Sequence, residues 1–252
     1  MHGGYDIHGG CYNACPIPGS ESSVNDKTSE ASSSPAQRPG RKISEKARNR
    51  RSLMVENKRA SIIQAALGLF SQYGLHGTSL DQVASSADVS KTNLLYYFGS
   101  KEDLYVSVLE QVLDTWLAPL RGFSADQDPL QAIGQYLRAK LELSRDHSAE
   151  SKLFCMEIMQ GAPLIGGQLS QALRELVASK VEVIGQWVEA GKLAPVDPYH
   201  LIFSLWSTTQ HYADFGAQVR AITGKDLSDP AFFEATLNSL QALLLDGLKP
   251  RP

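Results

Sequence analysis

The sequence predicts an all-α protein. Three observations favour this fold class: apolar residues recur every three or four positions from residue 57 onward, no stretch alternates as a strand does, and prolines fall between or at the starts of the helical segments. The 252 residues suffice for one large domain or two smaller ones.

The N-terminal 40 residues differ from the rest of the chain. They are rich in Gly, Ser and Pro and hold few apolar side chains, so we expect a disordered tail. The pairs His2/His8 and Cys11/Cys15 do not have zinc-finger spacing, and we expect no metal or other cofactor. The chain shows neither a signal pattern nor a long apolar run, and we therefore expect a cytoplasmic protein that does not enter a membrane.

Charge is unevenly distributed along the chain. Between Arg38 and Arg59, nine Lys or Arg residues stand against two Glu, a net charge of +7, although the whole chain carries −3. A basic segment of this kind favours a polyanionic partner. We expect residues 41–56 to form a basic arm that follows a nucleic-acid backbone or enters a minor groove.

The first helices can be placed from their apolar stripe and their caps. A helix begins near Asn57 and ends at Gly74, which suits a left-handed C-terminal position. Ser79 and Gln82 have capping-box spacing and open a short helix over 80–87. Ser90 is the expected cap of the next helix, over 91–98. Ser100 begins a longer helix that reaches about residues 116–119.

The rest of the chain continues the helical pattern. We expect helices over 129–145, 149–159, 168–190, 198–217 and 229–247.

The two short helices form a helix-turn-helix, the unit that places its second helix in the DNA major groove. Apolar residues should fix their crossing angle: Leu80, Val83 and Ala84 against Val89, Leu94 and Leu95. The remaining side chains would face outward, and Lys, Asn and Thr suit phosphates and base edges. Lys101 lies in the first turn of the following helix, where the macrodipole opposes a cation, so a nearby anion would explain it. Helix-turn-helix geometry also occurs without DNA, and Tyr96 or Tyr97 could belong to the core.

The segment "TSLDQVASSADVSKTNLLYYFGSKEDLY" resembles the N-terminal domain of TetR-family regulators. One departure is Asp88, where the family pattern has glycine. The resemblance implies a DNA-binding transcriptional regulator, mainly a repressor, that binds a palindromic operator in double-stranded DNA as a homodimer. Its half-sites would lie one helical turn, about 34 Å, apart. The candidate DNA contacts are Thr78, Ser79, Ser90, Lys91, Thr92, Asn93, Tyr96, Tyr97 and Lys101. The resemblance implies a DNA-binding domain over 57–105 and a ligand-binding and dimerisation domain over 106–252.

Motifs of the second domain, "WLAPL", "LFCMEIMQGAPL" and "STTQHYADF", are similar to pyrimidine-responsive members of this family. This similarity implies uracil or thymine as the effector and regulation of pyrimidine utilisation. From spacing, Trp206 and Gln210 share one helix face and together suit a flat polar ring. The candidate ligand contacts are Trp116, Phe154, Cys155, Met159, Gln160, Trp206 and Gln210. A buried Trp is also common in cores, and Gln210 could instead serve a dimer interface.

Other functions stay open on the residues alone. Cys155, His211 and Asp214 could form a nucleophilic triad, and Glu157, His211 and Asp214 a metal site, but neither has a local signature and we expect no enzyme. Two further alternatives are a regulator that senses bulky lipophiles and a ligand-binding protein with a vestigial helix-turn-helix. In the family, the helices at 198–217 and 229–247 resemble the pair that builds a four-helix bundle across a dimer.

Overall fold

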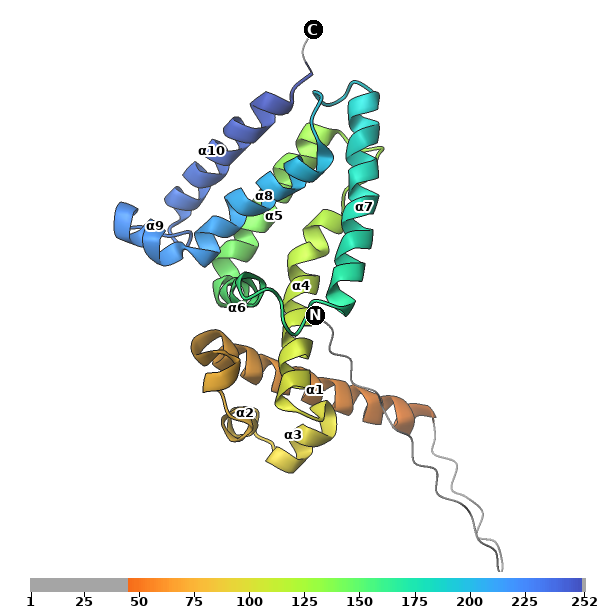
Figure 1. Cartoon of the computed structure of the whole chain (residues 1–252), viewed down its shortest axis with the longest axis vertical. Helices are drawn as coiled ribbons and strands as arrows, with labels where there is room; N and C mark the ends of the chain where they lie inside the picture. Colours follow the sequence, from red (N-terminus) through yellow and green to blue (C-terminus); the bar gives the residue numbers. More distant parts are fainter. Residues whose placement is uncertain (1–44, 251–252) are drawn as a thin grey trace, which may run out of the picture. The chain divides into compact units, whose positions relative to one another are not determined.

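The computed structural model describes residues 45–250, and all regular structure in that range is α-helical. The predicted fold class is confirmed. The helices are α1 (Glu45–Gly77), α2 (Leu80–Ser86), α3 (Lys91–Phe98), α4 (Lys101–Arg121), α5 (Pro129–Asp146), α6 (Ser148–Met159), α7 (Gln168–Glu189), α8 (Pro198–Asp214), α9 (Gly216–Thr223) and α10 (Pro230–Leu248) (Figure 1). Within the same range, none of the helices is long and apolar enough to cross a membrane.

Most predicted helix boundaries are confirmed, because the caps that predict them are formed. Ser79 and Gln82 make the capping box of α2, and Ser90 and Ser100 accept backbone N–H bonds at the starts of α3 and α4. Gly74 has φ 69° and ψ 178°, a positive-φ conformation that favours glycine, and it interrupts the first long helix where a break was expected, although not as a left-handed helical residue. Local capping therefore sets the register of the first four helices.

The start of the first helix is a correction. The sequence predicted a helix from about Asn57, but α1 begins at Glu45, so residues 45–56 of the expected basic arm are helical. The segment consists mostly of good helix formers, with Arg the most frequent, and it continues directly into the packed part of α1. The expected tail at 1–40, its His2, His8, Cys11 and Cys15, and residues 41–44 of the arm lie outside the described residues.

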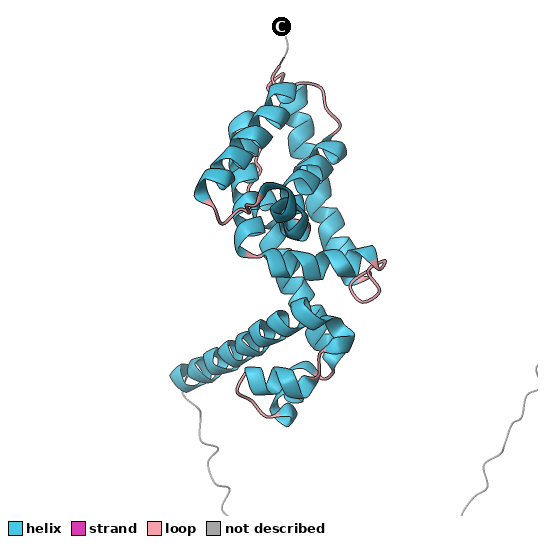
Figure 2. Cartoon of the chain, turned by 90° about the vertical axis from the view of Figure 1, so that its left-hand side faces the viewer, coloured by secondary structure: helices cyan, strands magenta, loops and turns pink. Residues whose placement is uncertain are grey.

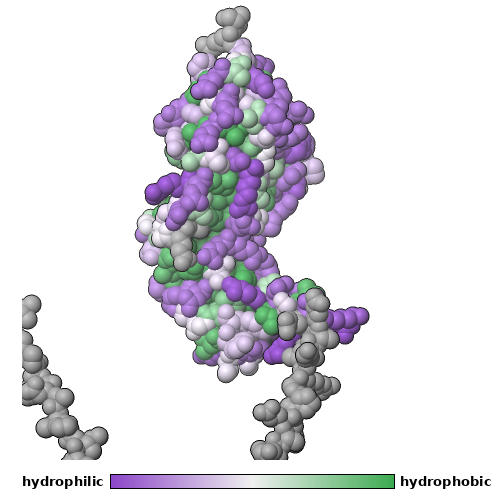
Figure 3. All heavy atoms as spheres, turned by 90° about the vertical axis from the view of Figure 1, so that its right-hand side faces the viewer, coloured by the Kyte–Doolittle hydropathy of each residue, from purple (hydrophilic) through white to green (hydrophobic). Residues whose placement is uncertain are grey.

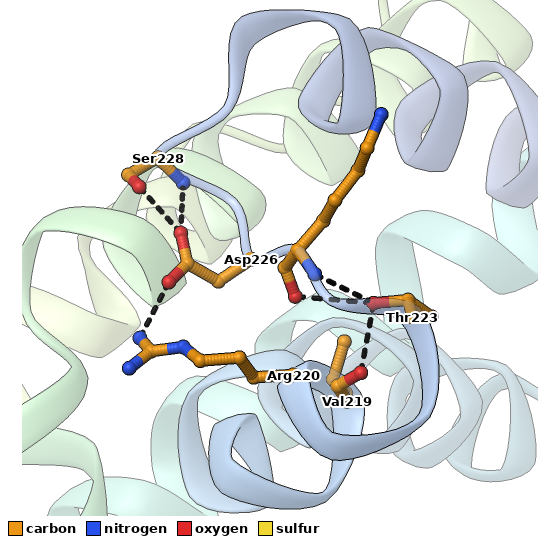
Figure 4. Close-up of polar contacts among 6 residues, drawn as sticks. Val219, Arg220, Thr223, Asp226 and Ser228 are labelled. Atoms are coloured by element: carbon orange, nitrogen blue, oxygen red, sulfur yellow. Dashed lines mark hydrogen bonds and ion pairs between the residues drawn. The ribbon is translucent and has the colours of Figure 1, made fainter.

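The helix expected over 198–217 is two helices, which is a second correction. Helix α8 ends at Asp214, and α9 runs from Gly216 to Thr223, followed by the C-cap Gly224, whose φ is 70°. The turn into α10 is held by polar bonds: Asp226 accepts from the Arg220 guanidinium and from Ser228, and the Thr223 hydroxyl donates to the Val219 carbonyl (Figure 4). Sequence periodicity continues through the break, so it did not reveal α9.

The core has two clusters that α4 connects. The first joins α1, α2, α3 and α4 as far as Trp116 with parts of α6 and Ala213 of α8, and the second joins α5, α7, α8 and α10 with Leu120 at the end of α4. Leu104 lies in the first cluster and Leu120 in the second, and neither is exposed. Helix α4 thus runs from the group formed by α1–α3 into the C-terminal helices (Figure 2).

Candidate functional site

Helices α2 and α3 form the helix-turn-helix expected from the sequence. Val83 and Ala84 of α2 and Leu94 and Phe98 of α3 are buried in the first cluster, where they fix how the helices cross. The opposite face of α3 is left to solvent. This packing gives α3 the amphipathic character of a helix that presents its polar side to a partner.

The turn between these helices contains a backbone conformation that favours glycine. Asp88 has φ 52°, and it stands where the family pattern has glycine. Asp tolerates the left-handed region better than most residues, and the Lys58 ammonium donates to the Asp88 carbonyl at 3.1 Å. The substitution is therefore accommodated without a change of turn.

Several predicted DNA contacts are exposed on α3 and at its start. Thr92 and Asn93 are exposed, and Tyr96 is 83% exposed, which is unusual for a large aromatic ring without a partner. Ser79 and Ser90 are exposed as well, although each uses its hydroxyl as a helix cap.

Lys91 and Tyr97, two other predicted DNA contacts, already interact with groups of the protein. The Lys91 ammonium pairs with the Asp81 carboxylate at 2.9 Å, an exposed ion pair that a phosphate could replace. Tyr97 is half-buried against the first cluster, and its ring stands edge-on to Tyr96 with centroids 5.5 Å apart. We therefore regard Tyr97 mainly as a support for Tyr96.

The structure changes the interpretation of Thr78 and Lys101. Thr78 is only 2% exposed, and its hydroxyl donates to the carbonyls of Leu69 and Gly74, so burial removes this side chain from contact with DNA. The Lys101 ammonium donates to the carbonyls of Leu75 and Thr78, at 2.9 and 3.2 Å. These carbonyls at the end of α1 supply the negative partner that the sequence suggested would come from an outside anion.

A basic residue of α1 also stabilises the reading head, the name used here for α1–α3 and the start of α4. The Arg59 guanidinium lies 4.8 Å from the centre of the Phe98 ring and donates to the Ser107 hydroxyl. Arg50 and Arg51, closer to the start of α1, are exposed. Part of the positive charge read from the sequence therefore stabilises the fold, and part remains available at the surface.

A second site is a cavity among five helices of the C-terminal part. It is lined by Leu113, Trp116 and Leu117 of α4, Lys140 of α5, Ser151 and Phe154 of α6, Leu173 of α7, and Trp206 and Gln210 of α8. It leaves about 60 Å³ of free space, on a scale where one water needs about 10–15 Å³. The cavity is small, mostly apolar and supplied with a few polar groups, as small-molecule sites are.

The polar groups of the cavity are poorly satisfied within the described part of the chain. Trp116 is 6% exposed, and its Nε1 donor has no hydrogen-bond partner. The Lys140 ammonium lies 3.8 Å from the centre of the Trp116 ring and donates to the Trp116 carbonyl at the long distance of 3.5 Å. Buried donors without good acceptors cost free energy, so these groups suit a ligand that brings acceptors.

Four of the seven predicted ligand contacts line this cavity. Trp116, Phe154, Trp206 and Gln210 lie together, although they come from three different helices. Cys155, Met159 and Gln160 do not line it: Gln160 is exposed, Met159 is 76% exposed, and the Cys155 thiol lies 3.8 Å from the Met159 sulfur. Only one face of α6 meets the cavity, through Ser151 and Phe154.

Sequence reasoning missed Lys140, Ser151 and three leucines of the wall. Lys140 had a readable signal, because it falls on the buried stripe of α5 with Tyr136, Leu137 and Leu141. A lysine on such a stripe suggests a functional role, since a charged group is almost never fully buried unless it is paired. The leucines carry no comparable signal.

The geometry does not support the triad of Cys155, His211 and Asp214. Asp214 accepts a hydrogen bond from the Ser151 hydroxyl, and His211 is exposed and stacks on Phe215. Burial and the Asp214 carboxylate raise the pKa of the Cys155 thiol, which is opposite to the activation of a nucleophile. Among the residues searched within the described range, no group of three His, Cys, Asp or Glu could hold a metal ion.

Comparisons with known proteins agree with this division of the chain. The family described as "Bacterial regulatory proteins, tetR family" matches residues 62–108, and "YcdC-like protein, C-terminal region" matches residues 109–251. The chain is 53% identical over 206 residues to the HTH-type transcriptional regulator RutR of Escherichia coli strain K12, covering 82% of this chain and 97% of that protein. It is 29% identical over 144 residues to the HTH-type transcriptional repressor NicS of Pseudomonas putida, covering 56% and 66%.

Solved structures give the same fold at lower identity. A putative transcriptional regulator from Streptomyces coelicolor has a TM-score of 0.60 and 23% identity, covering 77% of this chain and 99% of that one. A putative fatty acid metabolism regulator from Clostridium perfringens has a TM-score of 0.56 and 19% identity, covering 74% and 97%. The relatives are regulators rather than enzymes, and the chain belongs to the TetR family of bacterial transcriptional regulators.

Proposed function

We propose that this regulator controls genes of pyrimidine utilisation, mainly as a repressor, and that uracil or thymine releases it from a palindromic operator. The observation that carries the proposal is the position of α4. Its far end supplies Trp116 to the cavity, and its first residue, Lys101, is bonded to the end of α1 beside the reading head. One continuous helix therefore connects the ligand site with the helix-turn-helix.

A flat pyrimidine fits the chemistry of the cavity. The indoles of Trp116 and Trp206 offer stacking faces, and the Gln210 carboxamide offers donors and an acceptor to a ring edge that alternates N–H and C=O. The small free volume favours a single ring over a large effector. The similarity to RutR adds weight, since the chain spans nearly the whole of that protein.

The mechanism that we propose is a shift between two states of a homodimer. Filling the cavity would displace Trp116 and tilt α4, and the bonds of Lys101 to Leu75 and Thr78 would carry that movement to α1 and the reading head. A change in the separation of two reading heads lowers affinity for half-sites about 34 Å apart. The ligand can shift the equilibrium only as far as its preference for one state allows.

For the DNA side, we propose that Thr92, Asn93 and Tyr96 contact bases and that Ser79, Ser90 and Lys91 contact phosphates. The proposed DNA-binding domain spans 57–105 and the ligand-binding and dimerisation domain 106–252. Within the proposed basic segment 41–56, residues 45–56 would approach the DNA as the start of α1, and the tail 1–40 precedes the segment in sequence.

A second candidate effector is a larger lipophile. A wider apolar groove of about 340 Å³ adjoins the cavity and shares Leu173 and Trp206 with it, and the rest of its wall includes Ile158, Ile165 and Phe203. Figure 3, which faces α7, shows apolar side chains at the surface between hydrophilic ones. A bulky effector in this groove would also contact the Trp206 indole.

The deciding experiment compares nucleobases with lipophilic cations in a thermal-shift panel, followed by release of a fluorescent operator selected from random DNA. We expect uracil or thymine to raise the melting temperature and to release the operator. Stabilisation and release by the cations alone would contradict the pyrimidine assignment. Equal binding of the selected and the scrambled DNA would contradict a sequence-reading helix-turn-helix.

A further inference from the structure

Lys140 is a buried amine whose hydrogen bonding is incomplete. It lies on α5, is 1% exposed and lines the cavity. An ammonium carries three N–H donors, yet within the described residues this one makes a single long hydrogen bond, 3.5 Å to the Trp116 carbonyl. Its other close neighbour is the face of the Trp116 ring, at 3.8 Å. Donor capacity therefore remains toward the cavity.

The surroundings of Lys140 compensate its charge only in part. The carboxylate that acts on it is Asp214 of α8, and Asp214 already accepts from the Ser151 hydroxyl of α6. Helix α6 also brings the Cys155 thiol, whose own pKa is raised. Helices α4 and α7 contribute apolar wall residues and Trp116, and Glu234 of α10 is engaged with Arg138 at the surface.

Burial dominates the balance at this amine. It lowers the pKa of Lys140 to about 7, although Asp214 acts in the opposite direction. A lysine at this position costs stability without giving a strong internal contact, whereas an apolar residue of similar length would fill the same space. Trp116 and Gln210 give it no strong hydrogen bond within the described residues, so the site suits a ligand whose acceptor completes its hydrogen bonding.

We propose that Lys140 is a ligand-binding residue whose ammonium donates a hydrogen bond to a carbonyl oxygen of the bound ring. This inference rests on the proposed function, because it assigns a partner within the same cavity. It narrows the ligand class to flat rings that present an acceptor oxygen to Lys140 and a mixed donor and acceptor edge to Gln210. Apolar rings, and rings that carry only donors, would leave the amine without a partner.

The proposal makes ligand binding depend on protons. A carbonyl acceptor stabilises the charged amine, so binding raises the pKa of Lys140 above its value in the free protein. Above about pH 7 the free protein holds Lys140 mostly neutral, and the complex must take up a proton. Affinity should then fall by up to about tenfold for each pH unit above that value.

The experiment is calorimetric titration of the full chain with uracil at about pH 6 and about pH 8, each in two buffers of different ionisation enthalpy. At the higher pH we expect the wild type to take up most of one proton per site. Lys140→Met should remove this uptake and weaken binding about 10- to 100-fold at the lower pH. Methionine fills the same space without a charge, so this variant should fold at least as stably as the wild type.

Lys180→Met is the matched control. Lys180 also donates to backbone carbonyls, those of Arg121 and Phe123, but it does not line the cavity. We expect its affinity and proton uptake for uracil to match those of the wild type. A loss in Lys180→Met as large as in Lys140→Met would show a general effect of removing a lysine and would overturn the assignment.

Sulfur analogues identify the oxygen that faces Lys140. In 2-thiouracil and 4-thiouracil each carbonyl in turn becomes a weak acceptor. The isomer whose sulfur faces Lys140 should lose more affinity in the wild type than in Lys140→Met, whereas the loss for the other isomer, which Gln210 also senses, should be similar in both proteins. Undiminished uracil affinity and unchanged proton uptake in Lys140→Met would overturn this inference and leave the proposed function standing. A wild type that binds neither uracil nor thymine would overturn both.

Discussion

The reading head and the ligand cavity treat their polar groups in opposite ways. In the reading head, Ser79, Ser90 and Lys101 each bond to backbone groups, and the free polar side chains of α3 face water. In the cavity, the Trp116 Nε1 and the Lys140 ammonium are buried and poorly partnered. One region is complete without its partner, whereas the other is not.

Lys101 and Lys140 show how this difference affects the free energy of unfolding. Lys101 is half-buried and satisfies two carbonyls at the end of α1, so it stabilises the fold whether or not DNA is present. Lys140 is buried with one long contact, so it costs stability until a ligand arrives. We therefore expect changes in the reading head to affect folding and DNA affinity, and changes in the cavity to affect the ligand response.

The largest expected effect is the pH dependence that Lys140 gives to stability. Burial lowers the pKa of this amine from 10.5 to about 7, so between these values the unfolded chain binds more protons than the folded one. The free energy of unfolding should rise with pH across this window, by at most about 1.4 kcal/mol per pH unit, and lose this gain as pH falls toward 7. Urea unfolding of wild type and Lys140→Met at several pH values measures it.

Only the difference between the two proteins is diagnostic, because other groups titrate in the same range. Lys140→Met should be the more stable protein near pH 7, and the gap should close as pH rises. Parallel curves would mean that Lys140 is not desolvated as described, and the contrast between the two lysines would disappear.

The difference between the reading head and the cavity also explains which features could be predicted from the sequence. The reading head depends on local spacing: Ser79 and Gln82 lie three residues apart, as do Ser90 and Asn93, and Gly74 needs only its own positive φ. Such patterns predict helix boundaries and exposed faces well. The DNA role of Thr78 could not be judged in the same way, because its burial depends on the packing of α1 against α2.

The cavity depends on contacts between residues far apart in the chain. Trp206 and Gln210 share one helix face, which the sequence shows, but Lys140 and Ser151 join them only when α5 and α6 pack against α8. Met159 and Gln160 belong to the same sequence motif as Phe154, but both are exposed to solvent. The motif is longer than the single turn of α6 that contacts the cavity, so its last residues lie beyond the cavity wall. The spacing of residues along a helix does not predict which turn of α6 contacts the cavity.

The next prediction tests the ligand side of the contrast. Trp206→Ala removes a stacking face of the cavity and should weaken uracil binding by about 1–3 kcal/mol, measured by calorimetry. Operator affinity without ligand should stay within error of the wild type, since Trp206 lies in the second cluster. Loss of operator binding with an intact uracil response would reverse the roles assigned to the two regions.

On the DNA side, Asn93→Ala should weaken operator binding by about 1–3 kcal/mol and relax preference at one base pair of each half-site. The side chain is exposed and the cap from Ser90 uses the Asn93 backbone, so the fold should be unaffected. Anisotropy against single-base operator variants measures both effects. Ser86→Ala, exposed at the end of α2, is the matched surface control; a uniform loss over all sequences would instead indicate a phosphate contact.

Lys101→Met separates folding from DNA binding within the reading head. It leaves the carbonyls of Leu75 and Thr78 without their donor, and we expect it to lower the free energy of unfolding by about 1–2 kcal/mol. The slope of log affinity against log salt should remain that of the wild type at a temperature where both proteins are folded. A slope smaller by about one unit, with unchanged stability, would restore a phosphate role for Lys101.

The smallest expected effect is that of Asp88→Gly, at the turn residue that departs from the family pattern. Its φ of 52° costs an L-residue strain that a β-branched side chain would feel most. Asp88→Val should therefore lower the free energy of unfolding by about 1–2 kcal/mol, whereas Asp88→Gly should change it by less than about 1 kcal/mol, because relief of strain offsets the added freedom of the unfolded chain. Thermal unfolding measures both variants, and uracil binding should be the same in each. If Asp88→Val were as stable as Asp88→Gly, the turn would not be fixed by its backbone. The reading head would then differ from the cavity in its hydrogen bonds to nearby backbone groups, but the conformation of this turn would not be part of that difference.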